Sequence, residues 1–87
     1  MTRDEIRAAI LAAISGIAPE ADLSSLDAAA DLREQVDLDS FDFLNLMIAV
    51  HQRLGVEVPE RDYAQLSTLE RAVDYVAAHM GGSGKQI

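Results

Sequence analysis

Apolar side chains recur at helical spacing in three separate stretches, and this periodicity constrains the fold more than any other feature of the sequence. The first stretch has an isoleucine at every third or fourth position: Ile6, Ile10, Ile14 and Ile17. It predicts an amphipathic helix over residues 3–17. Thr2 and Glu5 have the spacing of a capping box at its start, and Gly16 and Pro19 mark its end.

The second stretch predicts a helix over residues 40–54 that is apolar on two faces. Asp39 is a suitable N-cap for this helix, and Gly55 is a natural stop. One face holds the residues that we expect in the core: Phe43, Met47, Val50 and Leu54, with Leu46 at the edge. The opposite face holds Phe41, Leu44 and Ile48. A domain this small has no second core for the opposite face, so we expect a partner to cover it.

The third stretch predicts a last helix over residues 68–80, opened by a second capping box from Ser67 to Glu70. Its inner face is expected to hold Leu69, Val73, Val76 and Met80, with Tyr75 close by. Gly81 marks the end of this helix, and residues 81–87 are expected to form a flexible tail.

Two connections join the three helices. Pro59 predicts a short helix over residues 60–65. Residues 18–38 form a long connection, whose scattered leucines predict that it lies against the core with a short helical turn. With 87 residues and no cysteine, the sequence predicts one all-α domain over residues 1–80 without disulfide bonds. We expect a small bundle of three main helices plus one short helix.

The negative charge of the chain is concentrated in one part. The net charge is −8, and residues 20–42 carry eight acids against a single base, Arg33, which makes −7. A protein that binds nucleic acid would need a basic face, so this class is excluded. The acidic stretch is either a solvated loop or a field that steers a basic partner towards Ser40.

The start of the chain and its apolar runs bear on its location. Met1 is followed by polar and charged residues that do not form a signal peptide, and no apolar run reaches the roughly 20 residues of a membrane span. We therefore expect a cytoplasmic protein that does not insert into membranes.

No self-contained catalytic or metal site is found in the sequence. His51 follows Ser40 by eleven residues, which is about 16 Å along the same helix. His79 lies near the end of the last helix, so no histidine accompanies the serine as a base. The alternating acids of residues 37–42 lack the glycine and the glutamate that a calcium loop requires further along. We expect no metal and no catalytic residue.

Ser40 stands where the acidic stretch meets the second helix. Free backbone N–H groups at a helix start favour negative charge, so a hydroxyl there is well placed to carry a phosphate. A serine also simply starts many helices. The absence of a catalytic partner favours the phosphate.

Over about residues 3–80 the sequence resembles the acyl carrier protein family. The resemblance is carried by Asp39-Ser40-Phe41-Asp42 with the following Leu46, by Val56-Glu57-Val58-Pro59, and by the segment from Ala72 to Val76. It implies that Ser40, beside Asp39, carries 4′-phosphopantetheine through a phosphodiester. It also implies a protein that is not an enzyme, because the thiol of that group holds an acyl cargo as a thioester for other enzymes.

The resemblance further implies that partners dock on the second helix. The expected docking face is Phe41, Asp42, Leu44, Asn45 and Ile48, together with Asp39. The expected partners are a phosphopantetheinyl transferase and enzymes that load or process the acyl group through basic or apolar patches. We expect the carrier itself to be a monomer.

Several residues depart from the family pattern. Phe41 replaces the usual leucine, Asp37 stands where glycine is frequent, and Asn45, His51, Gln52 and Arg53 stand where glutamates are common. These departures indicate a specialised pathway rather than housekeeping fatty-acid synthesis. Phe43 either shortens a cavity for the acyl chain or simply packs in the core. Two alternatives remain: a carrier of aminoacyl or peptidyl groups, and an unmodified helical adaptor that binds through the second helix.

Overall fold

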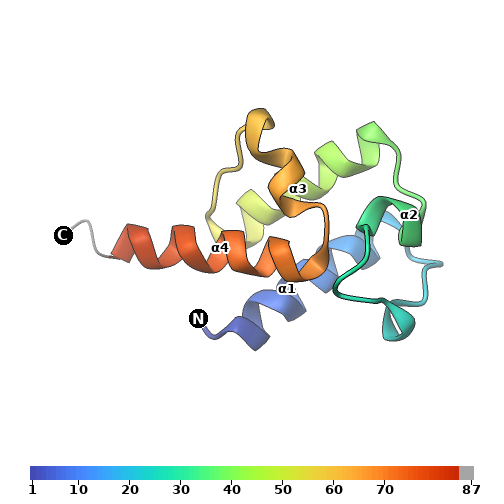
Figure 1. Ribbon diagram of the computed structural model, residues 1–87, viewed down its shortest axis with the longest axis horizontal. Helices are drawn as coiled ribbons and strands as arrows, with labels where there is room; N and C mark the ends of the chain where they lie inside the picture. The colour runs from blue at the N-terminus through green and yellow to red at the C-terminus, as the bar shows by residue number, and fades with distance from the viewer. Residues whose placement is uncertain (85–87) are drawn as a thin grey trace.

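The computed structural model is a helical bundle in which α1 (Arg3–Ile17) packs against both α3 (Ser40–Leu54) and α4 (Leu69–Gly84) (Figure 1). It describes the backbone of residues 1–84 and the side chains of residues 1–80. The connections contain a short helix, α2 (Leu32–Val36), and two 3₁₀ helices, η1 (Leu23–Ser25) and η2 (Glu60–Leu66). No β-strand forms among the described residues. The predicted all-α class is confirmed: the three main helices are α1, α3 and α4, and η2 is the short helix that was predicted over residues 60–65.

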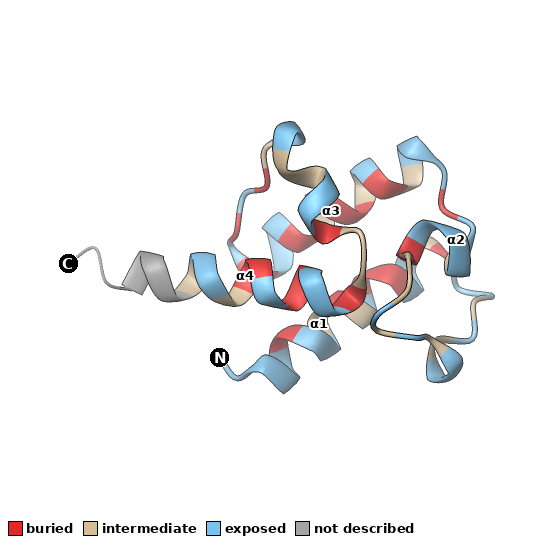
Figure 2. Cartoon of the chain, in the orientation of Figure 1, coloured by how far each residue is buried: buried red, intermediate tan, exposed pale blue. Residues whose placement is uncertain are grey.

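The core is built from the apolar faces that the periodicity predicted, and the buried segments of α1, α3 and α4 face one another (Figure 2). All five residues expected on the inner face of α3 are buried: Phe43, Leu46, Met47, Val50 and Leu54. Three of the four isoleucines of α1 are buried, and Ile17 at its end is half-buried. In α4, Tyr75 is buried among the predicted inner residues, whereas Met80 is only half-buried.

The first predicted capping box is present at the start of α1. The Glu5 N–H donates to Thr2 Oγ1 at 3.1 Å, and the Thr2 N–H donates to Glu5 Oε1 at 2.7 Å. Because the Glu5 carboxylate accepts that backbone N–H, its pKa is lowered. The reciprocal pair satisfies two N–H groups that an uncapped helix would leave free.

Two predictions about α4 were wrong. Its cap is Thr68, whose hydroxyl accepts the Arg71 N–H at 3.0 Å, so the expected pairing of Ser67 with Glu70 does not form. The Glu70 N–H instead donates to the Ala28 carbonyl at 3.0 Å. The helix also continues past Gly81 to Gly84. Glycine lowers helix propensity without forbidding a helix. Of the predicted tail, residues 85–87 lie outside the described residues.

The long connection packs against the core, as its leucines predicted, and it is also bonded to the start of α4. The Leu32 N–H donates to the Ser67 carbonyl at 2.8 Å, and Asp31 forms an isolated bridge with Thr68. Leu32 is fully buried and Leu38 is nearly so. These contacts fix the position of α2 relative to the start of α3, where Ser40 lies.

Candidate functional site

The start of α3 presents Ser40 to solvent. Asp39 is the N-cap and Ser40 is the first helical residue. The Asp42 N–H donates to Asp39 Oδ1 at 2.8 Å, and the Asp39 N–H donates to Asp42 Oδ2 at 3.4 Å. The prediction that Asp39 caps this helix is therefore confirmed, and Asp42 lies in its first turn. The capping box fixes the backbone on both sides of Ser40, whose side chain is exposed.

Two backbone donors at this helix start are unused. Among the described residues, the N–H groups of Ser40 and Phe41 donate to no acceptor. They carry the positive end of the α3 dipole. An anion bonded to the Ser40 oxygen would therefore lie beside free donors.

A cation that the sequence analysis did not assign to the site lies next to Ser40. Arg33, at the start of α2, approaches Ser40 Oγ with Nη2 at 3.4 Å. Its Nε donates to the Leu38 carbonyl at 3.2 Å, and its guanidinium lies 5.8 Å from the centre of the Phe43 ring. The signal in the sequence was that Arg33 is the single base within residues 20–42.

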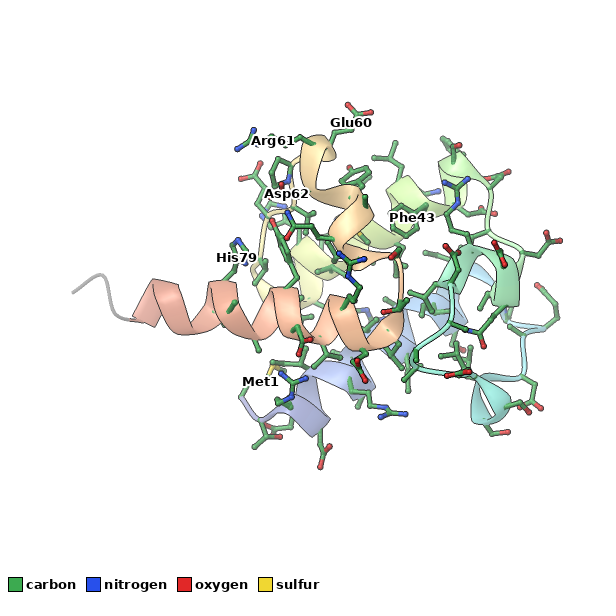
Figure 3. The ribbon with its side chains drawn as sticks, viewed as in Figure 1. Met1, Phe43, Glu60, Arg61, Asp62 and His79 are labelled. Carbon is green, nitrogen blue, oxygen red and sulfur yellow. The ribbon has the colours of Figure 1, made fainter. Side chains whose placement is uncertain are left out.

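An open groove with Ser40 in its wall lies between α3, η2 and the start of α2. Its volume is about 680 Å³. Its wall includes Arg33, Ser40, Phe41, Phe43, Leu44 and Tyr63. Phe43 and Tyr63 meet edge to face, with ring centres 5.8 Å apart, and this contact joins α3 to η2. Phe43 lies between these two elements (Figure 3). Phe43 thus separates the core from the groove beside Ser40.

The outer face of α3 is exposed as predicted. The exposed fractions are 69% for Phe41, 40% for Leu44 and 46% for Ile48. Asn45 and Asp42 are half-buried on the same helix. Three large apolar side chains at spacings of three and four form a continuous stripe open to solvent.

The remaining candidate residues lie apart from Ser40. His51 is exposed near the C-terminal end of α3, and His79 stacks on Tyr75 with ring centres 4.0 Å apart. The residues that the structure describes contain no cluster of histidine, aspartate and glutamate that could hold a metal ion. No helix in the described part of the chain is long and apolar enough to cross a membrane.

Comparison with known proteins gives consistent matches. A family model described as a phosphopantetheine attachment site matches residues 8–76. The acyl carrier protein of Rubrobacter xylanophilus is 34% identical over 58 residues, which are 67% of this chain and 72% of the relative. The mitochondrial acyl carrier protein of Neurospora crassa is 25% identical over 76 residues, which are 87% of this chain and 57% of the relative.

A solved structure shares the fold. The solution structure of a chain described as an acyl carrier protein of Anaplasma phagocytophilum superposes with a TM-score of 0.78 at 24% identity. The match covers 91% of this chain and 92% of that chain. The arrangement of helices described above is therefore shared with that structure.

The cofactor is 4′-phosphopantetheine, since the matching family model is that of its attachment site. The residues around Ser40 fit such a group. A phosphate there would meet the unused N–H groups of Ser40 and Phe41 and the guanidinium of Arg33. The groove with Ser40 in its wall has room for an extended arm and offers it an apolar wall.

Proposed function

Because this chain belongs to the acyl carrier protein family, we propose that Ser40 carries the phosphopantetheine arm and that the protein presents acyl intermediates to biosynthetic enzymes. The observation that carries this proposal is the exposed Ser40 hydroxyl on the first residue of α3, beside two unused backbone donors and Arg33. No histidine accompanies Ser40, which suits a hydroxyl that is modified by another enzyme.

Attachment would proceed by displacement at phosphorus. The Ser40 oxygen would form a bond to the pyrophosphate phosphorus of coenzyme A that carries pantetheine, and the P–O bond from this phosphorus towards the adenosine side would break. Adenosine 3′,5′-bisphosphate would leave, and a base of the transferase would take the hydroxyl proton. When bound, the group supplies a terminal thiol that holds the acyl cargo as a thioester. This chain contributes the attachment oxygen, the anion-stabilising helix start and the docking surface. We propose that it performs no catalysis itself.

Partners are proposed to dock on the outer face of α3. This face consists of Phe41, Asp42, Leu44, Asn45 and Ile48, next to Asp39. Its acids lie at the start of the helix, whereas Gln52 and Arg53 stand exposed near its end. Enzymes that read a continuously acidic helix would bind it weakly. A dedicated partner with an apolar patch and a basic rim would bind it better, which favours a specialised pathway.

Two further parts of the proposal concern the oligomeric state of the protein and its location in the cell. We propose that residues 1–80 act as one monomeric carrier domain, because each main helix contributes one buried apolar face to the same core. A cytoplasmic location stays a prediction, since one of the relatives above is mitochondrial.

Intact-protein mass spectrometry tests the attachment. After incubation with a phosphopantetheinyl transferase and coenzyme A, we expect the wild type to gain the mass of one phosphopantetheine group. Ser40→Ala should gain nothing. Ser67→Ala, which removes a different serine from the wall of the same groove, should gain the full mass.

Each other outcome contradicts part of the proposal. A gain that persists in Ser40→Ala would place the attachment elsewhere. No gain with any transferase tested would favour the unmodified adaptor. If the loaded protein accepted aminoacyl groups but no acyl group, it would be an aminoacyl carrier.

A further inference from the structure

We propose that Arg33 binds the phosphodiester on Ser40 and directs the arm along the groove between α3 and η2. This inference rests on the proposed attachment at Ser40 and adds a positioning residue for the attached group. Neither the family match nor the relatives assign a role to Arg33.

The position of Arg33 allows such a contact. Its Nη2 lies 3.4 Å from Ser40 Oγ, which is long for a hydrogen bond to a neutral hydroxyl. In a phosphodiester, the charged oxygens share a phosphorus with Oγ, so they lie close to Oγ and within reach of the guanidinium. Charge-assisted bonds from arginine to such oxygens are shorter and stronger than bonds to a hydroxyl. Attachment would therefore exchange a weak contact for a strong one.

Arg33 is also held in place on two other sides. Its Nε donates to the Leu38 carbonyl at 3.2 Å, two residues before Ser40. Its guanidinium lies 5.8 Å from the centre of the Phe43 ring, within the range of a cation–π contact. These contacts orient Arg33 without using Nη2. Among the described residues, no carboxylate forms an ion pair with Arg33.

The charge of the surrounding chain favours a cation beside the phosphodiester. Residues 20–42 carry −7 despite Arg33, and Asp39 and Asp42 lie on either side of Ser40. A phosphodiester adds a further negative charge to this region. The start of α3 offers two unused N–H groups, and Arg33 is the one full positive charge that the 20–42 stretch supplies.

The same geometry gives the arm a direction. Arg33 and Ser40 line the groove together with the carboxylates of Asp31 and Glu60, and Phe43 and Tyr63 form an apolar part of its wall. A phosphate held by Arg33 at the mouth of the groove would point the rest of the arm towards this wall. Contacts between the arm and Tyr63 would then be more frequent than contacts between the arm and Ile48, which lies on the outer face of α3.

The test compares the apo and loaded forms of the wild type, Arg33→Gln, Arg33→Lys and Arg53→Gln. Arg53→Gln is the control, because it removes the same charge from a position in α3 that is thirteen residues after Ser40. Thirteen residues of helix separate the two positions by about 20 Å along the axis. Mass spectrometry first verifies loading of each protein, which separates a failure of attachment from a failure of the role of Arg33. Thermal unfolding and the phosphorus NMR shift are then measured at low salt and at about 1 M salt.

If Arg33 binds the phosphodiester, loading should raise the melting temperature of the wild type by about 2–4 °C more than that of Arg33→Gln. This difference should shrink at high salt. Arg33→Lys should retain part of the additional rise in melting temperature that loading gives the wild type, and Arg53→Gln should retain all of it. The phosphorus NMR shift of the loaded Arg33→Gln protein should differ from that of the loaded wild type. The shift of the loaded Arg53→Gln protein should not. Equal gains and equal shifts in both glutamine variants would overturn the proposal.

A measurement on the wild type alone removes the dependence on variants. We expect the side-chain nitrogen resonances of Arg33 to shift on loading while those of Arg53 stay in place. Nuclear Overhauser contacts should join the arm to Tyr63 rather than to Ile48. Unchanged Arg33 resonances in a fully loaded wild type would also overturn the proposal.

Discussion

At the scale of single residues, Asp37 occupies a backbone position that would suit glycine better. It is the C-cap of α2 and has a left-handed backbone, with φ 59° and ψ 46°. Glycine takes this conformation without steric cost, which is a physical reason to expect glycine at this position. Aspartate tolerates it better than most residues but still at some cost. Asp37 therefore stores a small strain three residues before Ser40.

Replacing this residue should make the protein more stable. We expect Asp37→Gly to raise the free energy of unfolding by about 0.5–1 kcal/mol, because it relieves the left-handed strain. Urea unfolding followed by circular dichroism measures the change. Asp37→Asn keeps a residue that tolerates this backbone and removes the charge, so it reports the electrostatic share. A glycine variant no more stable than the asparagine variant would contradict the assignment of strain.

At the scale of elements, the two faces of α3 have different surroundings, because one is buried in the core and the other is open to solvent. Its inner face holds the bundle together, and Phe43 is 6% exposed. Its outer face leaves Phe41, Leu44 and Ile48 between 40% and 69% exposed, outside the core. The two faces can therefore be altered separately.

The outer face should matter for partners and not for stability. We expect Phe41→Ala and Leu44→Ala each to lower kcat/KM for loading by a phosphopantetheinyl transferase about tenfold. Both should change the free energy of unfolding by less than about 0.5 kcal/mol. Phe43→Ala should instead cost about 3–5 kcal/mol of stability. Gln52→Ala, an exposed change near the end of the helix, is the control and should leave kcat/KM unaltered.

The contact between η2 and α4 depends on a buried phenol. Tyr75 is 6% exposed, and its hydroxyl donates to Asp62 Oδ2 at 2.7 Å. Burial, and then the bond to this carboxylate, raise the pKa of Tyr75 to about 12. In the unfolded chain the phenol titrates near its ordinary value of about 10. The unfolded state therefore loses the proton first as the pH rises.

Stability should fall in alkaline solution for this reason. The contribution of Tyr75 is fully present below about pH 10. It is lost as the pH rises through its folded pKa of about 12. Urea unfolding of the wild type and Tyr75→Phe between about pH 8 and 12 measures the slope. Tyr75→Phe should lose about 1 kcal/mol at neutral pH and show a shallower alkaline decline. An identical decline in both proteins would contradict the assignment.

At the scale of the whole molecule, the uneven charge opposes folding. The net charge of −8 is almost entirely that of residues 20–42. Folding holds this stretch against the start of α4, through the bonds from Leu32 to Ser67 and from Glu70 to Ala28. Carboxylates that are spread apart in the unfolded chain are thereby brought together.

Salt should stabilise the protein by screening this repulsion. We expect the melting temperature of the apo protein to rise between about 0.05 and 0.5 M sodium chloride, over which range the Debye length falls severalfold. Glu20→Gln with Glu34→Gln, which removes two exposed acids from the stretch, should reduce the rise. A matched pair of substitutions outside this stretch, Asp4→Asn with Glu57→Gln, should leave most of the salt-dependent rise in melting temperature. A melting temperature that falls with salt would contradict this account.

The sequence by itself determined the elements and their faces. Apolar spacing predicted α1 and α3 to the residue, because a helix that must bury one face carries that face in its sequence. Local capping chemistry predicted the capping box at Thr2 and the N-cap at Asp39. The cap of α4 was misplaced by one residue, because the N–H of Glu70 is taken by Ala28, far away in sequence. The end of α4 was also misplaced, because the helix continues past Gly81, which was predicted to end it, to Gly84.

Only the tertiary structure decided how the surroundings of Ser40 are assembled. Arg33 reaches Ser40 because α2 is held against the start of α4 by the bond between Leu32 and Ser67. The groove exists because Tyr63 of η2 meets Phe43 of α3. Periodicity records which side of a helix faces a core, but it contains no information on which distant segment that side meets. The sequence therefore predicted the helix that begins at Ser40, and folding supplied the cation and the groove beside this serine.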